Sequence, residues 1–171
     1  MRIIIHMGSS LNSYCTYYKD CDTIALAEYN QYVEGGTIMS NTAKVNAFLD
    51  EAKVFYFLTT DGDQPKGRPF GFHMLVEDKL YFGCGTFKKV FQQLSANPKV
   101  EVLAMKGDEF LRYDGTVKVV KDDALLEKVR EAMPQIMAMY DKNGWEMGLF
   151  YLENGHAEIR GMMDLKEEFD V

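Results

Sequence analysis

Hydrophobic and polar residues alternate in short runs from residue 40 onward, and turn-forming residues separate the runs. Runs of aromatic and β-branched residues bounded by Gly, Pro, Asn and Asp are typical of β-strands. Apolar residues spaced three and four apart are typical of amphipathic helices. The predicted strands are 54–60, 66–77, 80–84, 100–105, 110–121, 147–152 and 156–162, and the predicted helices are 41–53, 87–96, 122–133 and 134–140.

Short turns connect most of the predicted strands. Among them is 153–155, where Asn154-Gly155 is a strong hairpin signal. Gly115 lies inside a long predicted strand and indicates a β-bulge. Helices enter at three places instead of following every strand, which argues against a doubly wound α/β fold. The pattern predicts a mainly β fold with α: a small antiparallel barrel of six or seven strands with peripheral helices.

The first 38 residues differ from the rest, because no clear period of 2 or 3.6 runs through them. We expect an N-terminal extension over 1–38 and one domain over 39–171. Glu34-Gly35-Gly36 back-translates to a bacterial ribosome-binding sequence, at the spacing of a start codon before Met39. One hypothesis is that Met39 is the natural start and residues 1–38 are translated upstream sequence. The alternative is a genuine but loosely packed extension.

Composition narrows the possible functions. Of the 171 residues, 47% are hydrophobic and 26% are charged, which is ordinary for a globular protein. Lys and Arg number 19 against 26 Asp and Glu, so the formal net charge is −7. This balance argues against a general nucleic-acid or anionic-membrane binder, since both need a basic surface. It leaves room for a local basic pocket that holds one small anion.

Cysteine and histidine usage predicts no structural metal and no disulfide framework. Cys15, Cys21 and Cys84 are odd in number and lack Cys-x-x-Cys spacing, and the three histidines are scattered. No apolar run approaches the ~20 residues of a membrane-spanning helix, and the start of the chain does not have the pattern of a signal peptide. Because free thiols suit a reducing compartment, a cytoplasmic location is expected.

The segment 83–89 carries the clearest chemical signal. Its sequence, Gly-Cys-Gly-Thr-Phe-Lys-Lys, reads as a strand end, a glycine turn and a helix start. Free N–H groups at a helix start favour an anion, whereas Lys88 and Lys89 oppose the helix dipole there unless an anion is bound. The spacing matches neither a Walker loop nor the dinucleotide fingerprint. The alternative interpretation is a pair of solvated surface lysines.

A second segment, 68–72, places Arg68 in an otherwise apolar strand beside Pro69 and Gly71. Burying an unpaired guanidinium is costly, and guanidinium is a natural bidentate ligand of phosphate. If a hairpin joins strands 66–77 and 80–84, Arg68 lies across from the strand end that leads to Thr86 and Lys88. The alternative is a surface arginine on an edge strand.

Residues 40–163 resemble the pyridoxamine 5′-phosphate oxidase-like family of FMN-binding split barrels. Segments 55–62, 68–71, 80–82, 86–90 and 97–100 carry the resemblance through their order and spacing. It implies a split β-barrel that forms a homodimer, with FMN in two clefts at the subunit interface. The cofactor-binding residues it implies are Arg68, Pro69, Phe70, Gly71, Phe72, Gly83, Cys84, Thr86, Lys88, Lys89, Phe110 and Arg112.

The resemblance also implies the role of each group. Arg68, Lys88 and Lys89 would bind the phosphate with help from Thr86, and 70–72 would line the flavin ring. The partner subunit would contribute residues of strand 110–121, Phe110 and Arg112 among them, and of the C-terminal strands, for which Phe150 and Leu152 are candidates.

The family's true pyridoxamine phosphate oxidases carry a C-terminal Arg-x-His that segment 156–162 lacks, and Glu158 would repel a substrate phosphate. We therefore expect an oxidoreductase that uses FMN to transfer hydride or electrons from a reduced nicotinamide to an unidentified small molecule. One alternative is a non-catalytic flavin- or haem-binding protein, with His73 and His156 as candidate axial ligands. Another is an interaction module that has lost its cofactor site.

Overall fold

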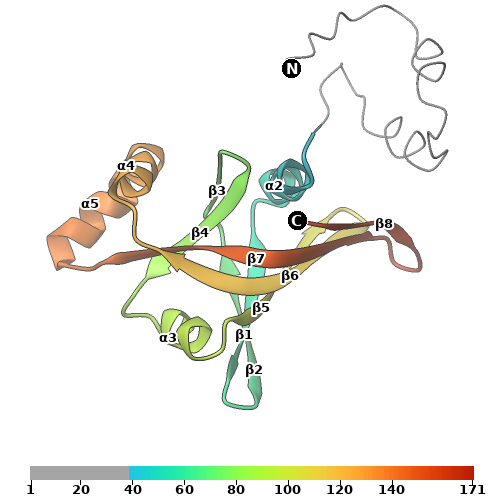
Figure 1. Cartoon of the computed structure of the whole chain (residues 1–171), viewed down its shortest axis with the longest axis horizontal. Coiled ribbons are helices and arrows are strands. Elements are labelled where there is room, and N and C mark those ends of the chain that lie inside the picture. Colours follow the sequence, from blue (N-terminus) through green and yellow to red (C-terminus); the bar gives the residue numbers. More distant parts are fainter. Residues whose placement is uncertain (1–38) are drawn as a thin grey trace, which may run out of the picture. The chain divides into compact units, whose positions relative to one another are not determined.

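The computed structural model describes residues 39–171, which form eight antiparallel strands and four helices (Figure 1). The expectations for 1–38, including the start at Met39 and the free Cys15 and Cys21, concern the segment outside the described residues. The strands are β1 (Phe55–Asp61), β2 (Gln64–Phe70), β3 (His73–Val76), β4 (Lys79–Gly85), β5 (Lys99–Lys106), β6 (Glu109–Val120), β7 (Met147–Arg160) and β8 (Leu165–Asp170). The helices are α2 (Asn41–Ala52), α3 (Lys89–Ala96), α4 (Asp123–Ala132) and α5 (Pro134–Asn143).

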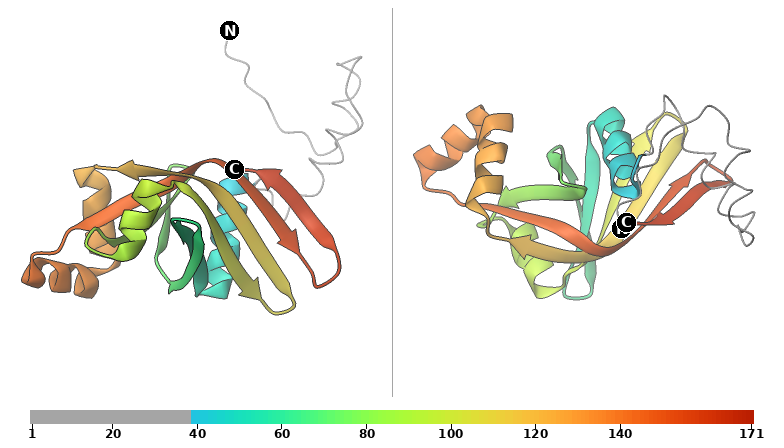
Figure 2. Two further views of the ribbon diagram at one scale, coloured as in Figure 1. Left: turned by 90° about the horizontal axis from the view of Figure 1, so that it is seen from below. Right: turned by 45° about the horizontal axis from the view of Figure 1, so that its top comes forward.

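The sheet order explains how the fold becomes a split barrel. The strands follow the order β2-β1-β5-β6-β7-β4-β3, and β8 pairs with β7. β2 and β3 are therefore at opposite ends of this order, yet only Gly71 and Phe72 separate them in the chain. The sheet must curl until its two ends meet at this link, and it does so without closing (Figure 2). The predicted fold class is confirmed, with eight strands in place of six or seven.

The predicted strand 66–77 is two strands. β2 pairs only with β1, where Arg68 is opposite Phe57, and β3 pairs only with β4, where His73 is opposite Phe82. The expectation that Arg68 lies across the hairpin from the end of β4 is therefore wrong. Pro69 fits its place because β2 is an edge strand, where the missing N–H breaks no ladder.

The predicted hairpin at Asn154-Gly155 is also wrong, because β7 runs straight through it to Arg160. Between the pairs Asp114–His156 and Thr116–Glu153, two residues of β7 lie opposite the single Gly115 of β6. The Asn-Gly pair thus serves a bulge: Asn154 has φ +52°, and a Cβ on Gly155 would lie 2.7 Å from the Tyr113 ring. The chain turns back later, after Gly161, to form β8.

Two apolar layers hold the strands in place. The larger lies inside the curl, where α2 contributes Val45, Phe48 and Leu49 and α3 contributes Val90 and Leu94. In the smaller layer, residues of α4 and α5 pack against residues of β3, β4 and β7. Ser40 and Asp122 cap α2 and α4 by accepting hydrogen bonds from main-chain N–H groups. No helix in residues 39–171 is long and apolar enough to cross a membrane.

Candidate functional site

Arg68 is held in one orientation by neutral oxygen atoms. Its Nη1 donates to the main-chain oxygen of Phe57 (3.0 Å) and to Thr59 Oγ1 (2.7 Å), and its Nη2 donates to Gln93 Oε1 (2.6 Å). Thr59 and Gln93 are themselves buried and joined by a hydrogen bond of 2.8 Å. The network ties β1, β2 and α3 together and aims the guanidinium before any ligand arrives. Burial lowers the pKa of Arg68.

Lys88 and Lys89 stand at the start of α3. Lys88 is the N-cap residue, and no side chain caps this helix. Its uncapped N–H groups and its dipole therefore favour a negative charge just where two exposed lysines gather. Both Lys88 and Arg68 act electrostatically on the Cys84 thiol, so the two cations flank the same strand end. Burial nevertheless raises the pKa of Cys84 to about 11.

These cations have no anionic partner among the described residues. Neither lysine makes an ion pair there, and Arg68 is the one arginine of residues 39–171 without a carboxylate within 4 Å. Arg68 is partly buried, and a partly desolvated positive charge without a counterion is unfavourable, whereas the two exposed lysines remain hydrated. The group of Arg68, Lys88 and Lys89, which we call the cationic cradle, is therefore suited to an anion supplied from outside the described chain.

A pocket of about 350 Å³ opens beside the cradle. The end of β1 contributes Thr60 and Asp61, the turn after it contributes Gly62, and α3 contributes Lys89, Gln92 and Gln93. Gln93 thus belongs both to the pocket wall and to the network that holds Arg68. The pocket gives a ligand access to the cradle from the β1–β2 side of α3.

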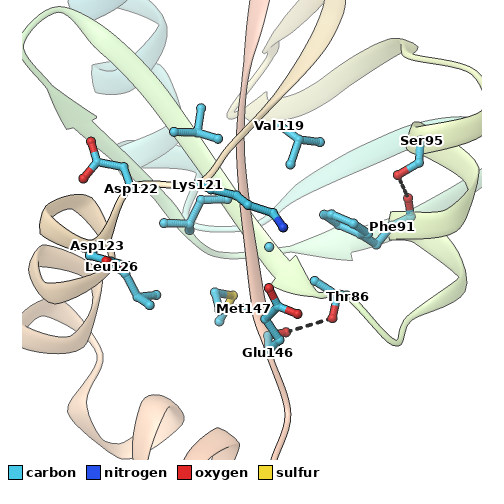
Figure 3. A pocket seen from close by; sticks show the side chains of 13 residues that line it. Thr86, Phe91, Ser95, Val119, Lys121, Asp122, Asp123, Leu126, Glu146 and Met147 are labelled. Atoms are coloured by element: carbon cyan, nitrogen blue, oxygen red, sulfur yellow. Dashed lines mark hydrogen bonds between the residues drawn. The ribbon is translucent and has the colours of Figure 1, made fainter.

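Thr86 contacts the main chain of Glu146. Its main-chain N–H donates to the Glu146 carbonyl oxygen at 3.0 Å, and its hydroxyl lies 3.4 Å from the same oxygen. Its side chain lines a different pocket, of about 440 Å³, between α3 and the start of α4. Figure 3 shows Thr86 beside Glu146 there, with Lys121 extending into the same space.

The rings of Phe70, the last residue of β2, and of Phe72 in the link to β3 pack in different layers. Phe70 packs inside the curl, with its ring centroid 5.2 Å from that of Phe57. Phe72 packs in the layer under α4 and α5 and covers Gly83, where a Cβ would lie 3.2 Å from the Phe72 ring. Pro69 and Gly71 are exposed. The main chain of 69–71 is therefore the part of this predicted segment that a ligand reaches.

The residues predicted to act on a partner's cofactor divide into two groups. Arg112 is half exposed and pairs with Glu101 at 3.1 Å, and Phe110 is partly exposed on the same side of β6. Phe150 and Leu152 lie in the core inside the curl, where they cannot reach a neighbouring subunit. That part of the expectation is wrong, because the inward side of β7 is the one that carries them.

Sequence reasoning missed Thr59 and Gln93. Thr59 faces inward in β1, as do Phe57 two positions earlier and Phe55 four positions earlier. The alternation therefore marks Thr59 as a polar residue that points toward the core. Gln93 lies three residues after Val90 on the buried side of α3. A buried hydroxyl and a buried amide need partners, so this signal marks both residues as members of a buried hydrogen-bond network without naming Arg68.

The fold is matched by comparison with known proteins. Residues 42–159 match the family model of pyridoxamine 5′-phosphate oxidase, so the chain belongs to that family. More particularly, the chain is similar to a NimC/NimA family protein from Clostridium acetobutylicum. The two sequences are 32% identical. The match to the crystal structure of that protein covers 85% of this chain and 99% of the other chain, with a TM-score of 0.69. No curated protein matches the sequence.

More distant structures share the fold alone. A pyridoxamine 5′-phosphate oxidase-related, FMN-binding protein from Nostoc punctiforme is 15% identical, with a TM-score of 0.56 over 78% of this chain and 91% of its own. A haem-binding protein from Mycobacterium smegmatis is 10% identical, with the same TM-score over 78% of this chain and 59% of its own. The family's fold therefore occurs in proteins that bind FMN and in proteins that bind haem.

Proposed function

We propose that this protein binds FMN, with the phosphate in the cationic cradle, and acts as an FMN-dependent oxidoreductase. The observation that carries the proposal is the cradle itself: Lys88 and Lys89 begin an uncapped helix, Gln93 of the same helix holds Arg68, and the three cations have no carboxylate partner in residues 39–171. In a chain of net charge −7, such a concentration of unpaired positive charge calls for a specific anion.

The residues of the cradle divide the binding of FMN between them. Arg68 is pre-oriented by Phe57, Thr59 and Gln93, so little conformational entropy is lost when it meets a phosphate. The lysines supply mobile point charges at the mouth of the pocket. The exposed main chain of 69–71 would support the ring. Bound FMN supplies hydride and electron transfer, and the protein supplies orientation and electrostatics.

The substrate of the proposed reaction is a small molecule other than pyridoxamine phosphate. Segment 156–162 has no Arg-x-His, and Glu158 already pairs with Arg160 at 3.2 Å. A carboxylate at this place repels a substrate phosphate. The proposed electron donor is a reduced nicotinamide, and the free, buried Cys84 thiol supports a cytoplasmic location.

The proposal includes a homodimer. The outward side of β1 and β5 bears Tyr56 (51% exposed), Leu103 and Met105 (66% exposed), and Tyr56 is opposite both Pro69 and Leu103. Exposed apolar residues in such a row favour burial against a second copy. Arg112 continues the same row on β6, opposite Leu103, so this contact would bring it close to the partner.

A haem-binding function is the second candidate, because a haem-binding protein shares the fold. The histidines of residues 39–171 do not favour it. His73 is 7% exposed and hydrogen-bonds Asp50 at 3.1 Å, and His156 lies between Glu168 and Asp170. Neither presents a free ring nitrogen to an open pocket, as an axial ligand of iron must.

The test is titration of the flavin-free protein with FMN and with riboflavin, which lacks the phosphate. We expect FMN to bind far more tightly. Replacing both Lys88 and Lys89 by Ala should weaken FMN binding by about 1.5–3 kcal/mol for each charge-assisted hydrogen bond lost and leave riboflavin binding nearly unchanged. Lys118→Ala, an exposed lysine on β6, is the matched control.

Equal affinity for the two flavins would overturn the cradle as the phosphate site. A protein that holds haem, recognised by its Soret band, and does not bind FMN would favour the second candidate. Oxidation of a reduced nicotinamide by the FMN-loaded protein tests the oxidoreductase part. A protein that binds FMN and shows no such turnover would be a flavin carrier.

A further inference from the structure

A third pocket, of about 410 Å³, lies away from the cationic cradle. Its walls come from the β3–β4 turn, the start of α2, the middle of β7 and Val171. β4 connects the two sites: Lys79 and Leu80 at its beginning line this pocket, and Cys84 at its end adjoins the cradle. None of the pocket's lining residues belongs to the cradle. We call it the β3–β4 pocket.

A tyrosine hydroxyl at the floor of the β3–β4 pocket is open to the pocket and is not sealed within the core. Tyr113 is 1% exposed and lines the pocket, and its hydroxyl makes no hydrogen bond with the described residues. Thr42, 9% exposed, lines the same space and its hydroxyl is likewise unpaired within residues 39–171. Because each hydroxyl is accessible from the pocket, solvent there can satisfy it, and a ligand that displaces this solvent has to supply a hydrogen bond in its place. Burial raises the pKa of Tyr113, so the group remains a donor.

Around these hydroxyls the floor is apolar, because Leu80 and Leu152 are almost completely buried. The rim is charged and carries Asp78, Lys79 and Glu153. The Lys79 ammonium already lies over the Tyr151 ring, 4.9 Å from its centroid. Glu153 accepts a hydrogen bond of 2.9 Å from the Tyr151 hydroxyl, and Asp78 accepts one from Ser40.

The charges at the rim select the sign of a ligand. Two carboxylates face one ammonium that is engaged with an aromatic ring, so the balance favours a cation. The floor determines the chemistry of the opposite end of the ligand. The part of the ligand that lies there has to be apolar and has to carry one polar atom that hydrogen-bonds the Tyr113 hydroxyl. A volume of about 410 Å³ accommodates one small molecule of this kind.

We propose that the β3–β4 pocket binds a small primary amine with an apolar body, whose far end bears an oxygen that hydrogen-bonds the Tyr113 hydroxyl and whose ammonium lies between Asp78 and Glu153. The site is separate from the cradle, and the proposal does not depend on FMN.

The experiment uses the full chain and three probes of one shape in calorimetric titrations. Tyramine has both the ammonium and the hydroxyl, phenethylamine lacks the hydroxyl, and 4-ethylphenol lacks the ammonium. We expect tyramine to bind at least about fivefold more tightly than either analogue, the ratio that one hydrogen bond supplies. Tyr113→Phe should remove the advantage of tyramine over phenethylamine, and Glu153→Gln should weaken both amines.

The variants have internal controls. Because the Tyr113 hydroxyl has no partner in the described chain, Tyr113→Phe should melt at the same temperature as the parent or slightly above it. Thr42→Val repeats the test on the second hydroxyl. FMN binding, measured in each variant, should stay unchanged, which separates failure here from failure of the cradle.

Three results would overturn the proposal. The first is absence of tyramine binding at millimolar concentrations. The second is tighter binding of 4-ethylphenol than of tyramine, which would make the ammonium irrelevant. The third is equal weakening of both amines by Tyr113→Phe in a protein that melts normally, because the hydroxyl would then not read the far end of the ligand.

Discussion

At the scale of single residues, Arg68 differs from the other arginines of the described domain in what it contacts. Those others, Arg112, Arg130 and Arg160, each pair with one or more carboxylates. Arg68 uses its donors on a carbonyl, a hydroxyl and an amide. Neutral acceptors fix the position of the guanidinium without neutralising its positive charge, and a binding site for an anion requires both.

Gln93→Glu tests this distinction. The new carboxylate would stand where the amide oxygen now lies, 2.6 Å from Arg68 Nη2, and would neutralise the guanidinium. We expect FMN affinity to fall by at least about tenfold, while urea unfolding shows no loss of stability. Gln92→Glu introduces the same charge on the preceding residue of α3, whose side chain makes no hydrogen bond with Arg68. Equal losses in the two variants would mean that only the general field near α3 matters.

The three cations of the cradle could be found from the sequence because their residue types and glycine-rich surroundings are visible there. Thr59 and Gln93 could not be assigned from it, since a polar residue at an inward position does not name its partner. The role of Thr86 in phosphate binding stays a prediction from the family resemblance. In the structure its hydroxyl lies 3.4 Å from the Glu146 carbonyl oxygen, a partner so distant in sequence that the local pattern does not reveal it.

At the scale of elements, the position of α3 depends on a close approach to β7. A Cβ on Gly148 would lie 2.2 Å from the Phe91 ring, so the ring rests against bare main chain. Phe91 follows Lys88 and Lys89 on the same helix, and Gln93 holds Arg68. Contact between Gly148 and Phe91 therefore sets where the cradle's cations stand.

Gly148→Ala should push Phe91 outward and shift α3. Overpacking of this kind costs about 1–3 kcal/mol of unfolding free energy, and FMN affinity should fall with it. The combination with Phe91→Leu removes the obstructing ring edge and should restore much of both, as measured by urea unfolding and FMN titration. If the single variant unfolds and binds like the parent, the approach of α3 to β7 is not a constraint.

β8 shows another limit of sequence reasoning at this scale. Its pattern, Leu-Lys-Glu-Glu-Phe-Asp, reads as an acidic tail, yet it pairs with β7 along an exposed edge. Much of what holds it is electrostatic and distant in sequence: Lys44 with Glu167, Lys166 with Glu109, and His156 with Glu168 and Asp170. The hairpin prediction at Asn154-Gly155 failed for a similar reason. Pairing with β6, which is distant in sequence, makes the Asn-Gly pair a bulge within β7 instead of a turn.

The pairing of His156 with β8 predicts a pH dependence. The hydrogen bond to Asp170, followed by the charges of Glu168 and Asp114, raises the pKa of His156. A raised pKa in the folded state stabilises it fully below the unfolded value, about 6.5, and this stabilisation is lost as pH rises through the folded value. Thermal midpoints should therefore decrease less between about pH 6 and pH 9 in His156→Gln than in the parent. Parallel profiles would contradict the assignment.

At the scale of the whole molecule, curling of the sheet gives the domain an inside filled by two helices and an outside that is bare over β1 and β5. α2 and α3 bury their apolar residues within the curl, and the outward Tyr56 and Met105 remain exposed. The hydrophobic pattern predicted the barrel class, because alternation fixes which side is inward. It could not separate β2 from β3, since that break follows from the path of the whole sheet.

Tyr56→Lys tests the proposed homodimer. A charge in the middle of the outward row should favour the monomer, as measured by light scattering after size-exclusion chromatography, with little effect on the monomer's own stability. FMN affinity should fall together with dimerisation if the partner completes the site. Ile136→Lys, at a comparably exposed apolar position on α5 (42%), is the control and should remain dimeric. A parent that is monomeric at all concentrations would refute the dimer.

The two-residue link between β2 and β3 has a consequence for how the molecule comes apart. Phe70 packs in one apolar layer and Phe72 in the other. The main chain of 69–71, which would support a flavin ring, is therefore held by both layers. Loosening either layer displaces that segment. Urea should therefore release bound flavin at the same concentration at which the near-ultraviolet circular dichroism of the aromatic residues in both layers is lost. No partly folded state that retains flavin should be seen at higher urea concentrations.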